Sequence, residues 1–488
     1  MYLMEKKEKF LLYLSFLDIY SNRRKVPYIR NFEKWQINNT CIMSRLSQKL
    51  VLLHIYFPHS SCGRMYFYLV WSYKNREETK YMKRNAENLF TADGFNKCNK
   101  IMLSCAALLF IIGVVFVFEA DRSAILSSAS KGVRQIIWSA GGLLFTAFFL
   151  LVNYKKLASE KLLLFFLVPL TAMLVILALC SLIHLFGHEV RFSGAGLGIR
   201  RINGAFRWIE LGPLNFQPSV FVQVFLILFI AAQLSQIPDD SKRKAKSSAV
   251  AISSKEYVSS ALIKYRSLWF SLLIFVLIFA QPSTSVAISV MVTALAMTAL
   301  KNSKIVFGRN FFIIVAVILL AGLIAWNAFP HIRERVERGG DNFQSRQAVL
   351  AIGSGGVLGL GLGNSEAKHS RLPEIENDYI FSLIAEETGF VGSVLFMGIY
   401  VVFILQGFMT AIRAKDSFAK LAAFGFSVNY AFAFLVHLFV NLGFISTGAG
   451  LPFVSYGGTA MLADSIALGI LLNISGSLEK TSQERTKT

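Results

Sequence analysis

The stretch IMLSCAALLFIIGVVFVF, at residues 101–118, decides the fold class of this chain. It carries no charge, and as an α-helix it extends about 27 Å, close to the thickness of the hydrocarbon core of a membrane. Comparable apolar runs recur along the chain, so the sequence predicts an all-α fold, a polytopic integral membrane bundle of about ten transmembrane helices. The predicted spans are 101–118, 135–153, 162–186, 218–236, 268–281, 284–300, 310–326, 379–407, 420–441 and 458–473.

The composition agrees with a membrane protein and argues against a nucleic-acid partner. Of the 488 residues, 54% are hydrophobic and only 16% are charged, whereas about 25% are charged in soluble domains. The net charge is +21, of which +10 falls in residues 1–100. The remaining +11 falls largely in short loops between apolar runs, where basic residues set orientation and contact membrane lipids. The five cysteines form no CxxC pair, so neither a zinc site nor a disulfide framework is indicated.

The chain divides into three predicted parts. Residues 1–100 form a basic N-terminal extension in the cytoplasm, 101–475 the membrane domain, and 476–488 a cytoplasmic tail. Two interpretations of residues 1–81 stand. They are an extension that touches the membrane surface, or they are a start-site artefact and translation begins at Met82.

Short basic loops predict the orientation. An even number of spans places these loops and both termini in the cytoplasm. The loops 187–217, 327–378 and 442–457 then face the other side. The basic residues of the short loops and the tail are Lys155, Lys156, Lys161, Lys242, Arg243, Lys244, Lys246, Lys301, Lys304, Arg309, Arg413, Lys415, Lys420, Lys480, Arg485 and Lys487.

Polar residues that could carry chemistry gather in the outward loops. Arg207 offers a planar fork for an anion, and Trp208 suits a membrane interface; an interfacial anchor is the plainer interpretation of this pair. A glycine-rich segment, 353–363, is compatible with backbone N–H groups that cradle phosphate oxygens. Asp378 stands at the outer end of the eighth span, where it is either a functional carboxylate or an ordinary helix N-cap.

Two further features lie within or beside the later spans. Glu386 and Glu387 are acidic residues inside a span, which is costly; we expect them to partner backbone or basic groups in the bundle rather than to act directly in catalysis. The segment 450–459, with its proline and paired glycines, returns the chain sharply to the membrane and forms either a cavity wall or a turn.

Four sequence blocks resemble the SEDS family (shape, elongation, division and sporulation), most closely its cell-division members. They are NGAxRWIxLG followed by FQPS at 203–219, AIGSGGxxGxGLGNSxxKxxxLPExxxDYIF at 351–381, EExGFxG at 386–392, and LPFVSYGG at 451–458. They follow one another in the family's order, and the resemblance covers about residues 100–475.

The resemblance implies a peptidoglycan glycosyltransferase. Such an enzyme polymerises lipid II, the undecaprenyl-linked disaccharide-pentapeptide, into glycan strands for septal wall synthesis, and releases undecaprenyl pyrophosphate. It implies partners, a class B penicillin-binding protein and divisome proteins, and a place in the bacterial inner membrane at the septum, with the active site facing the periplasm. The family's essential acidic residue falls on Asp378.

The other implied site residues are contacts of substrate. We expect no resident cofactor beyond an optional divalent cation, Mg²⁺ or Mn²⁺, and no protein metal site. The predicted substrate-binding residues are Arg207, Trp208, Gln217, Ser219, Gln344, Gln347, Lys368, Glu374, Ser455 and Tyr456.

This chain departs from the family pattern at several polar positions. Val220 and Gln223 replace Glu and Lys, Ser283 replaces Asp after Gln-Pro, and His437 replaces Gln. The alternatives to a polymerase are therefore a lipid II flippase and a noncatalytic division scaffold. A glycosyltransferase like the O-antigen ligases is disfavoured by the second and fourth blocks.

Overall fold

The structure is a computed structural model of the chain. It describes residues 98–121, 130–186, 188, 192–194, 197–199, 201, 205–212, 214–237, 254–301, 343–368, 372, 374–445 and 447–485. The predicted extension up to residue 97, the alternative start at Met82, the span 310–326 and the basic cluster 242–246 lie outside these residues.

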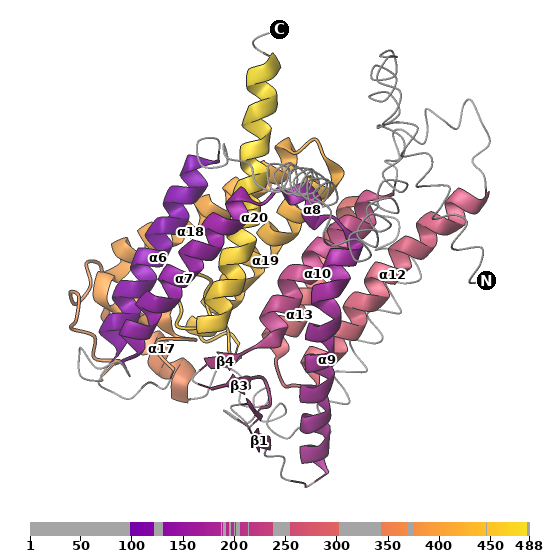
Figure 1. The fold of residues 1–488 in the computed structure, drawn as a ribbon. Coiled ribbons are helices and arrows are strands. Elements are labelled where there is room, and N and C mark those ends of the chain that lie inside the picture. Colours follow the sequence, from indigo (N-terminus) through magenta and orange to yellow (C-terminus); the bar gives the residue numbers. More distant parts are fainter. Residues whose placement is uncertain are drawn as a thin grey trace, which may run out of the picture. The chain divides into compact units, whose positions relative to one another are not determined.

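Helices dominate the described part of the chain, as the apolar runs predict (Figure 1). Eight of the described helices are long and apolar enough to cross a membrane, which confirms the all-α membrane bundle. A further predicted span, 268–281, coincides with α12, whose apolar part Arg266–Phe279 is shorter. The helices are α6 (Lys100–Ala120), α7 (Lys131–Leu151), α8 (Tyr154–Leu157), α9 (Glu160–Leu185), α10 (Pro218–Ser235), α12 (Ser254–Phe279), α13 (Thr284–Lys301), α17 (Phe343–Ser354), α18 (Ile380–Arg413), α19 (Ser417–Asn441) and α20 (Gly458–Arg485).

Side chains of nearby residues cap the N-termini of several of these helices. The Asn99 side chain accepts a hydrogen bond from the Met102 amide at 3.1 Å, and Asp416 accepts one from the Ala419 amide at 3.3 Å. Each bond satisfies an amide that has no partner within its own helix. Asp121 accepts from the Gly132 amide at 3.0 Å and so ties the end of α6 to the start of α7.

The loop predicted at 187–217 contains a small antiparallel sheet. Its strands are β1 (Phe192–Gly194), β2 (Leu197–Ile199), β3 (Ile209–Leu211) and β4 (Leu214–Phe216), hydrogen-bonded in that order. With three residues each, the strands are too short for a clear alternation of apolar and polar residues, so the sequence shows only a loop. Ile199 and Ile209, paired between β2 and β3, cluster with Leu177 and Cys180 of α9, which anchors the sheet on that helix.

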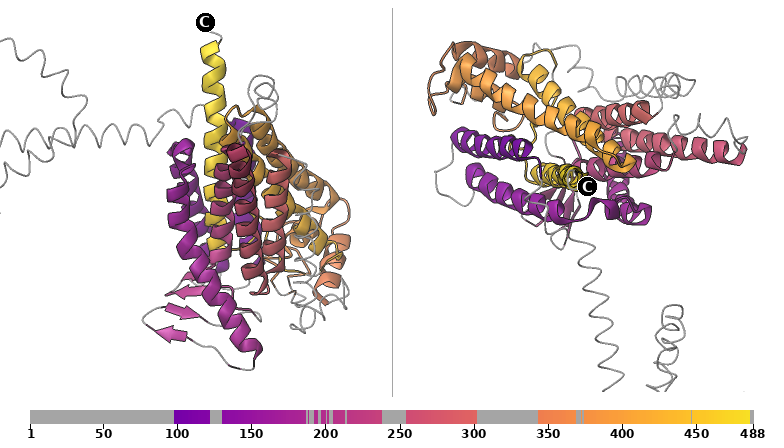
Figure 2. Two further views of the ribbon diagram at one scale, coloured as in Figure 1. Left: turned by 90° about the vertical axis from the view of Figure 1, so that its right-hand side faces the viewer. Right: turned by 90° about the horizontal axis from the view of Figure 1, so that it is seen from above.

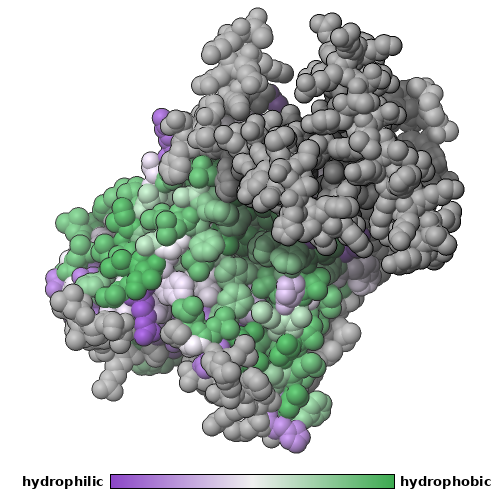
Figure 3. All heavy atoms as spheres, in the orientation of Figure 1, coloured by the Kyte–Doolittle hydropathy of each residue, from purple (hydrophilic) through white to green (hydrophobic). Residues whose placement is uncertain are grey.

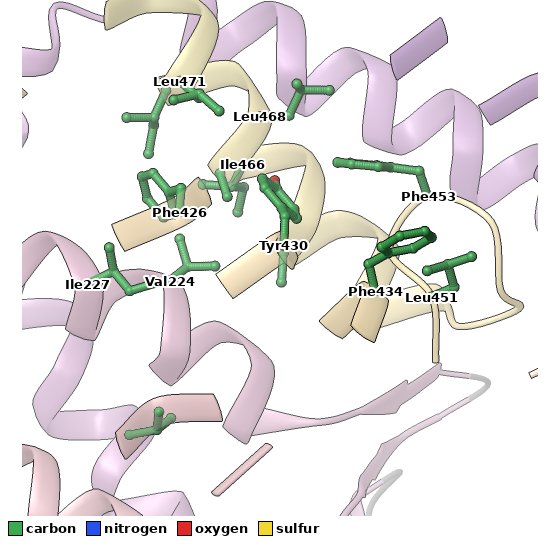
Figure 4. Packing of buried hydrophobic residues seen from close by; sticks show 14 of the residues in the cluster. Val224, Ile227, Phe426, Tyr430, Phe434, Leu451, Phe453, Ile466, Leu468 and Leu471 are labelled. Atoms are coloured by element: carbon green, nitrogen blue, oxygen red, sulfur yellow. The ribbon is translucent and has the colours of Figure 1, made fainter. Parts of the chain in front are cut away.

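The hydrophobic core extends through the described helices, and one densely packed part of it lies where α19, α20 and the segment 451–456 meet. Figure 4 shows Tyr430 of α19 near Ile466 of α20 and Phe453 of that segment, and the Tyr430 hydroxyl donates to the Asp464 carbonyl oxygen at 2.8 Å. Phe434 stacks on Tyr400 of α18 with ring centroids 4.5 Å apart. Elsewhere α20 packs along α7, and Figure 2 shows the two helices together.

The flanks of the bundle are apolar. Leu144 of α7 and Phe165 of α9 are each 72% exposed, and Figure 3 shows hydrophobic side chains over much of the visible helix surface. An apolar surface of this extent is unusual in a soluble monomer and suits contact with lipid tails.

The two ends of the bundle differ. We call the "loop end" the one that carries β3, β4 and the segments 281–285, 374–379 and 442–457; α20 begins there (Figure 1). At the opposite end Lys301 donates to Ser417 at 3.3 Å, and Arg266 pairs with Glu160 at 2.6 Å. The predicted basic loops that the structure describes lie at this opposite end. Which side of the membrane each end faces stays a prediction, as do the cytoplasmic termini.

Candidate functional site

Asp378 lies in the turn before α18, and it is not the helix cap. The N-cap residue is Tyr379, whose side chain makes no capping hydrogen bond. Instead, Asp378 Oδ1 accepts a hydrogen bond from the Ala449 amide at 2.9 Å. Oδ2 lies beside Gly448, where an added Cβ would sit 3.2 Å away. The carboxylate is therefore oriented by a loop remote in sequence, and Asp378 is only half-buried.

Asn441, the last residue of α19, holds the backbone of Asp378. Its side-chain nitrogen Nδ2 donates to the Asp378 carbonyl oxygen at 3.0 Å and to the His437 carbonyl oxygen at 2.8 Å. Its side-chain oxygen accepts from both the amide and the hydroxyl of Ser382, at 2.9 and 2.7 Å. Sequence reasoning missed this role; the signal was a buried polar residue at the end of an apolar span.

The loop that carries Ala449 is fastened on its other side to the start of α13. The Ser285 hydroxyl donates to the Gly448 carbonyl oxygen at 2.6 Å. The Thr447 hydroxyl lies 3.0 Å from that of Thr284 and 2.8 Å from that of Ser285. The short 442–457 loop thus bridges Asp378 and the tight turn that joins α12 to α13, which we call the Pro282 hairpin.

Arg207 supports the same hairpin. Its Nε donates to the Gln281 carbonyl oxygen at 3.4 Å, and a terminal nitrogen donates to the Pro282 carbonyl oxygen. A tight turn between two spans leaves carbonyls without helical partners, and Arg207 satisfies two of them. Trp208 lies next to it, with its ring centroid 6.0 Å from the guanidinium carbon.

The acidic turn before Asp378 is held by the segment 451–456. The Ser455 hydroxyl donates to the Asn377 carbonyl oxygen at 2.5 Å, and the Tyr456 backbone amide donates to the Glu376 carbonyl oxygen at 2.9 Å. Within the turn, the Glu374 carboxylate accepts a hydrogen bond from the side-chain nitrogen of Asn377. Lys131 at the start of α7 forms an ion pair with the Glu376 carboxylate. Three predicted site residues, Glu374, Ser455 and Tyr456, are therefore direct neighbours of the segment that carries Asp378.

Lys368 belongs to a different cluster. Its Nζ lies 3.5 Å from Glu119 Oε2 and 3.8 Å from Glu387 Oε1, and its side chain is only 11% exposed. The Glu387 side chain is fully buried, and its carboxylate faces Lys368 and the backbone of Gly363 and Ser365. The pairing compensates a buried charge that would otherwise be very costly, and it confirms that Glu387 partners a basic group inside the bundle.

Glu386, also buried, fastens the loop that follows α17. It accepts hydrogen bonds from the Glu366 amide at 3.0 Å, the Ala367 amide at 3.2 Å and the Ser354 hydroxyl at 3.3 Å, as well as from Ser365. A carboxylate that accepts several backbone and hydroxyl donors is strongly stabilised. The expectation of a backbone-binding role is confirmed.

The glycine-rich segment approaches α18 rather than an open space. The Leu360 and Gly361 amides donate to the carbonyl oxygens of Glu386 and Glu387, each at 3.0 Å, and the Phe390 amide donates to the Gly356 carbonyl oxygen at 2.9 Å. A Cβ on Gly359 would lie 2.2 Å from the Glu387 carbonyl oxygen. Close packing on α18 therefore explains Gly355 and Gly359 without any phosphate.

The neutral replacement at Gln223 has neutral partners. Gln223 Nε2 donates to the Ser289 hydroxyl at 2.8 Å and to the Asn429 side-chain oxygen, which joins α10, α13 and α19. Ser289 donates to the same oxygen at 2.8 Å. A charge here would need a counter-charge, whereas this triad satisfies itself.

The remaining predicted site residues lie on flanking elements. Gln217 precedes α10 and donates to the hydroxyl of the buried Ser219 at 3.2 Å. Gln344 and Gln347 are half-buried on α17, which packs against α18 and α19. Among the residues described, no group of three or more His, Cys, Asp or Glu side chains is placed to hold a metal ion, and the need for a divalent cation stays a prediction.

Comparison with known proteins identifies the family. The family model of FtsW, RodA and SpoVE proteins, described as "Cell cycle protein", matches residues 99–480. The chain belongs to this family. Its FtsW/RodA/SpoVE region comprises every site residue described above.

Curated relatives and a solved structure agree with this assignment. A Trichlorobacter lovleyi protein named "Probable peptidoglycan glycosyltransferase FtsW" is 27% identical over 392 residues, 78% of this chain and 93% of that protein. A Pseudomonas fluorescens protein of the same name is 32% identical over 305 residues, 60% of this chain and 70% of that protein. A solved structure described as "Structural coordination of polymerization and crosslinking by a peptidoglycan synthase complex" is 24% identical, with a TM-score of 0.54 over 78% of this chain and 98% of that chain. That likeness supports the FtsW/RodA/SpoVE fold.

Proposed function

We propose that this chain is a peptidoglycan glycosyltransferase that polymerises lipid II into glycan strands during cell division. Family membership and relatives named as peptidoglycan glycosyltransferases support the activity. The observation that carries the proposal is Asp378, a half-buried carboxylate at the loop end with one oxygen held by the Ala449 amide.

In the proposed reaction Asp378 acts as general base. The 4-hydroxyl of the acceptor sugar loses its proton to Asp378 Oδ2 as its oxygen attacks the anomeric carbon of the donor. A new glycosidic bond forms, the bond to the pyrophosphate breaks, and undecaprenyl pyrophosphate leaves. The hydrogen bond from Ala449 to Oδ1 keeps the carboxylate oriented for this transfer.

Basic groups are proposed to stabilise the leaving pyrophosphate. Arg207 lies at the loop end on the Pro282 hairpin, which also holds the Ala449 loop through Ser285. Lys368 is paired with Glu119 and Glu387, so a role for it in binding phosphate requires that it exchange a carboxylate partner. A bound Mg²⁺ or Mn²⁺ would supply further charge stabilisation of the same oxygens.

We place the loop end in the periplasm, at the division septum of the inner membrane. The predicted basic loops at the opposite end support this orientation, and the relatives named FtsW support the role in division. A class B penicillin-binding protein is the proposed partner, since the strands must be crosslinked, and the structural relative belongs to a peptidoglycan synthase complex.

The test uses the full chain, purified with its penicillin-binding partner and supplied with labelled lipid II. Wild type is expected to form glycan strands, and Asp378→Asn to form none, because asparagine takes no proton at neutral pH. Glu160→Gln, which loses a surface ion pair at the opposite end, is the control with normal synthesis. If Asp378→Asn synthesises strands as fast as wild type, Asp378 is not the general base. If wild type itself makes no strands, the result favours the flippase or the scaffold.

A further inference from the structure

His437 is a buried histidine that the proposed reaction does not use. It lies on α19 with no solvent exposure, and its Nδ1 is 2.6 Å from the Ala449 carbonyl oxygen. A carbonyl oxygen only accepts hydrogen bonds, so Nδ1 carries the proton and donates. Nε2 has no hydrogen-bond partner among the described residues, so the ring is held through Nδ1.

The residue that His437 binds is the one that binds Asp378. The Ala449 carbonyl oxygen accepts from His437, and the Ala449 amide donates to Asp378 Oδ1 at 2.9 Å. Ala449 is thus fixed at both of its backbone polar groups. It lies between Gly448 and Gly450, and glycine has the greatest backbone freedom of any residue. The orientation of the Ala449 amide therefore depends on contacts rather than on the local chain.

The end of α19 holds Asp378 in two ways. Asn441, one turn after His437, donates to the Asp378 carbonyl oxygen at 3.0 Å and so fixes the backbone. His437 acts on the side chain through Ala449. From the opposite side, the Ser285 hydroxyl holds the Gly448 carbonyl oxygen at 2.6 Å.

We propose that His437 is a positioning residue for Asp378: by holding the Ala449 carbonyl oxygen, it keeps the Ala449 amide directed at the catalytic carboxylate. The inference rests on the proposed function, in which Asp378 is the base. Without the bond from His437, the Ser285 bond still holds the Gly448 carbonyl oxygen, but the Ala449 carbonyl oxygen is released and the Ala449 amide is held less firmly toward the carboxylate.

The decisive comparison separates the hydrogen bond from the bulk of the ring. His437→Gln retains an N–H that can reach the Ala449 carbonyl oxygen, whereas His437→Leu fills similar space without a donor. His437→Met, which is unbranched and also lacks a donor, is the second donor-free variant; it is used if the His437→Leu protein does not fold. Ser427→Ala is the matched control, since it removes a buried bond of 2.7 Å to Ala423 on the same helix with no link to Asp378.

Each variant is purified as the full chain with its penicillin-binding partner, and strand synthesis is measured with penicillin present to block crosslinking. The donor-free variants are expected to lose about tenfold to a hundredfold in kcat, because a small misplacement of a reacting group has that effect. Their KM for lipid II and their melting temperature are expected to match those of Ser427→Ala. His437→Gln and Ser427→Ala are expected to keep kcat close to wild type.

A structural measurement makes the inference independent of activity. Cryo-electron microscopy of the donor-free variants is expected to show Asp378 Oδ1 beyond hydrogen-bond distance of the Ala449 nitrogen, and of His437→Gln to show the bond intact. The inference is overturned if the donor-free variants keep the Asp378–Ala449 hydrogen bond or the wild-type kcat. It is also overturned if the kcat of His437→Gln falls as far as theirs. If wild type makes no strands, the proposed function fails, while the structural measurement still decides the positioning role.

Discussion

At the scale of single residues, Asp378 differs from an acidic residue that merely begins a helix. Its carboxylate accepts from the Ala449 amide, and its own carbonyl oxygen accepts from Asn441. An Asn at position 378 keeps an oxygen for the Ala449 amide but cannot take a proton. The Asp378→Asn variant therefore separates proton transfer from the orientation of the side chain.

Gly448→Ala tests the space beside the carboxylate. The new methyl group would sit 3.2 Å from Asp378 Oδ2, at the oxygen that we assign to the proton. We expect kcat for strand synthesis to fall about tenfold or more, because the acceptor hydroxyl can no longer approach that oxygen in the right geometry. The time course of labelled glycan strands on a gel measures this rate.

Gly450→Ala is the matched control in the same loop. Its Cβ would meet Ser455 Cβ at 3.7 Å, an ordinary van der Waals contact, and Gly450 is exposed as Gly448 is. It is expected to synthesise strands at the normal rate. Normal synthesis by Gly448→Ala would mean that Oδ2 is not the oxygen approached by substrate.

At the scale of elements, α18 is two helical segments joined at Gly389, which has φ +70°. A break inside a membrane span leaves amides and carbonyls without helical partners, and these must be satisfied within the protein. Residues 356–361 supply the partners, since their backbone bonds to that of residues 386–391. The glycine-rich segment is thus a structural part of the broken helix.

Gly359→Ala tests this element. Gly359 has φ +82°, and a Cβ there would lie 2.2 Å from the Glu387 carbonyl oxygen. The strained backbone alone costs about 1–3 kcal/mol, and the overlap adds to it, so we expect a clear fall in the melting temperature of the purified protein. Thermal unfolding monitored in detergent measures the change.

Gly353→Ala provides the comparison. Gly353 lies within α17, and its Cβ would meet no atom within 4 Å. Alanine favours a helix over glycine by up to about 1 kcal/mol, so its melting temperature should stay the same or rise. A Gly359→Ala variant as stable as Gly353→Ala would contradict the close packing of this segment on α18.

At the scale of the whole molecule, the bundle has apolar flanks and two chemically different ends. The Asp378 site lies at the loop end, and the described basic loops lie at the opposite end. Basic loops are retained in the cytoplasm, so the loop end should face outward. A reaction on an outward-facing lipid-linked sugar requires this orientation.

Cysteine labelling in intact cells checks it. In a background with the five native cysteines replaced by serine, a membrane-impermeant maleimide is expected to label Leu214→Cys on β4. Lys415→Cys, in the turn between α18 and α19, is expected to react only after the cells are opened. The reverse pattern would place Asp378 in the cytosol and end the proposed function.

The sequence by itself determined the class of fold, the approximate spans and the leading catalytic candidate. In lipid every backbone polar group must be satisfied internally, so an apolar run of sufficient length becomes a helix whatever its neighbours are. That rule is local, and it predicted α6, α9 and α19 closely. The sequence blocks around Asp378 carried the family resemblance for the same reason: each is a continuous segment.

Only the tertiary structure decided which groups meet. The partners of Asp378 come from 63 and 71 residues further along the chain, and Lys368 pairs with Glu119 from 249 residues before it. The glycines of 355–361 and the small sheet likewise depend on packing against α18 and α9. Hydropathy along a chain fixes which segments are helices, but contacts between their ends depend on how distant helices pack, and no local pattern records that.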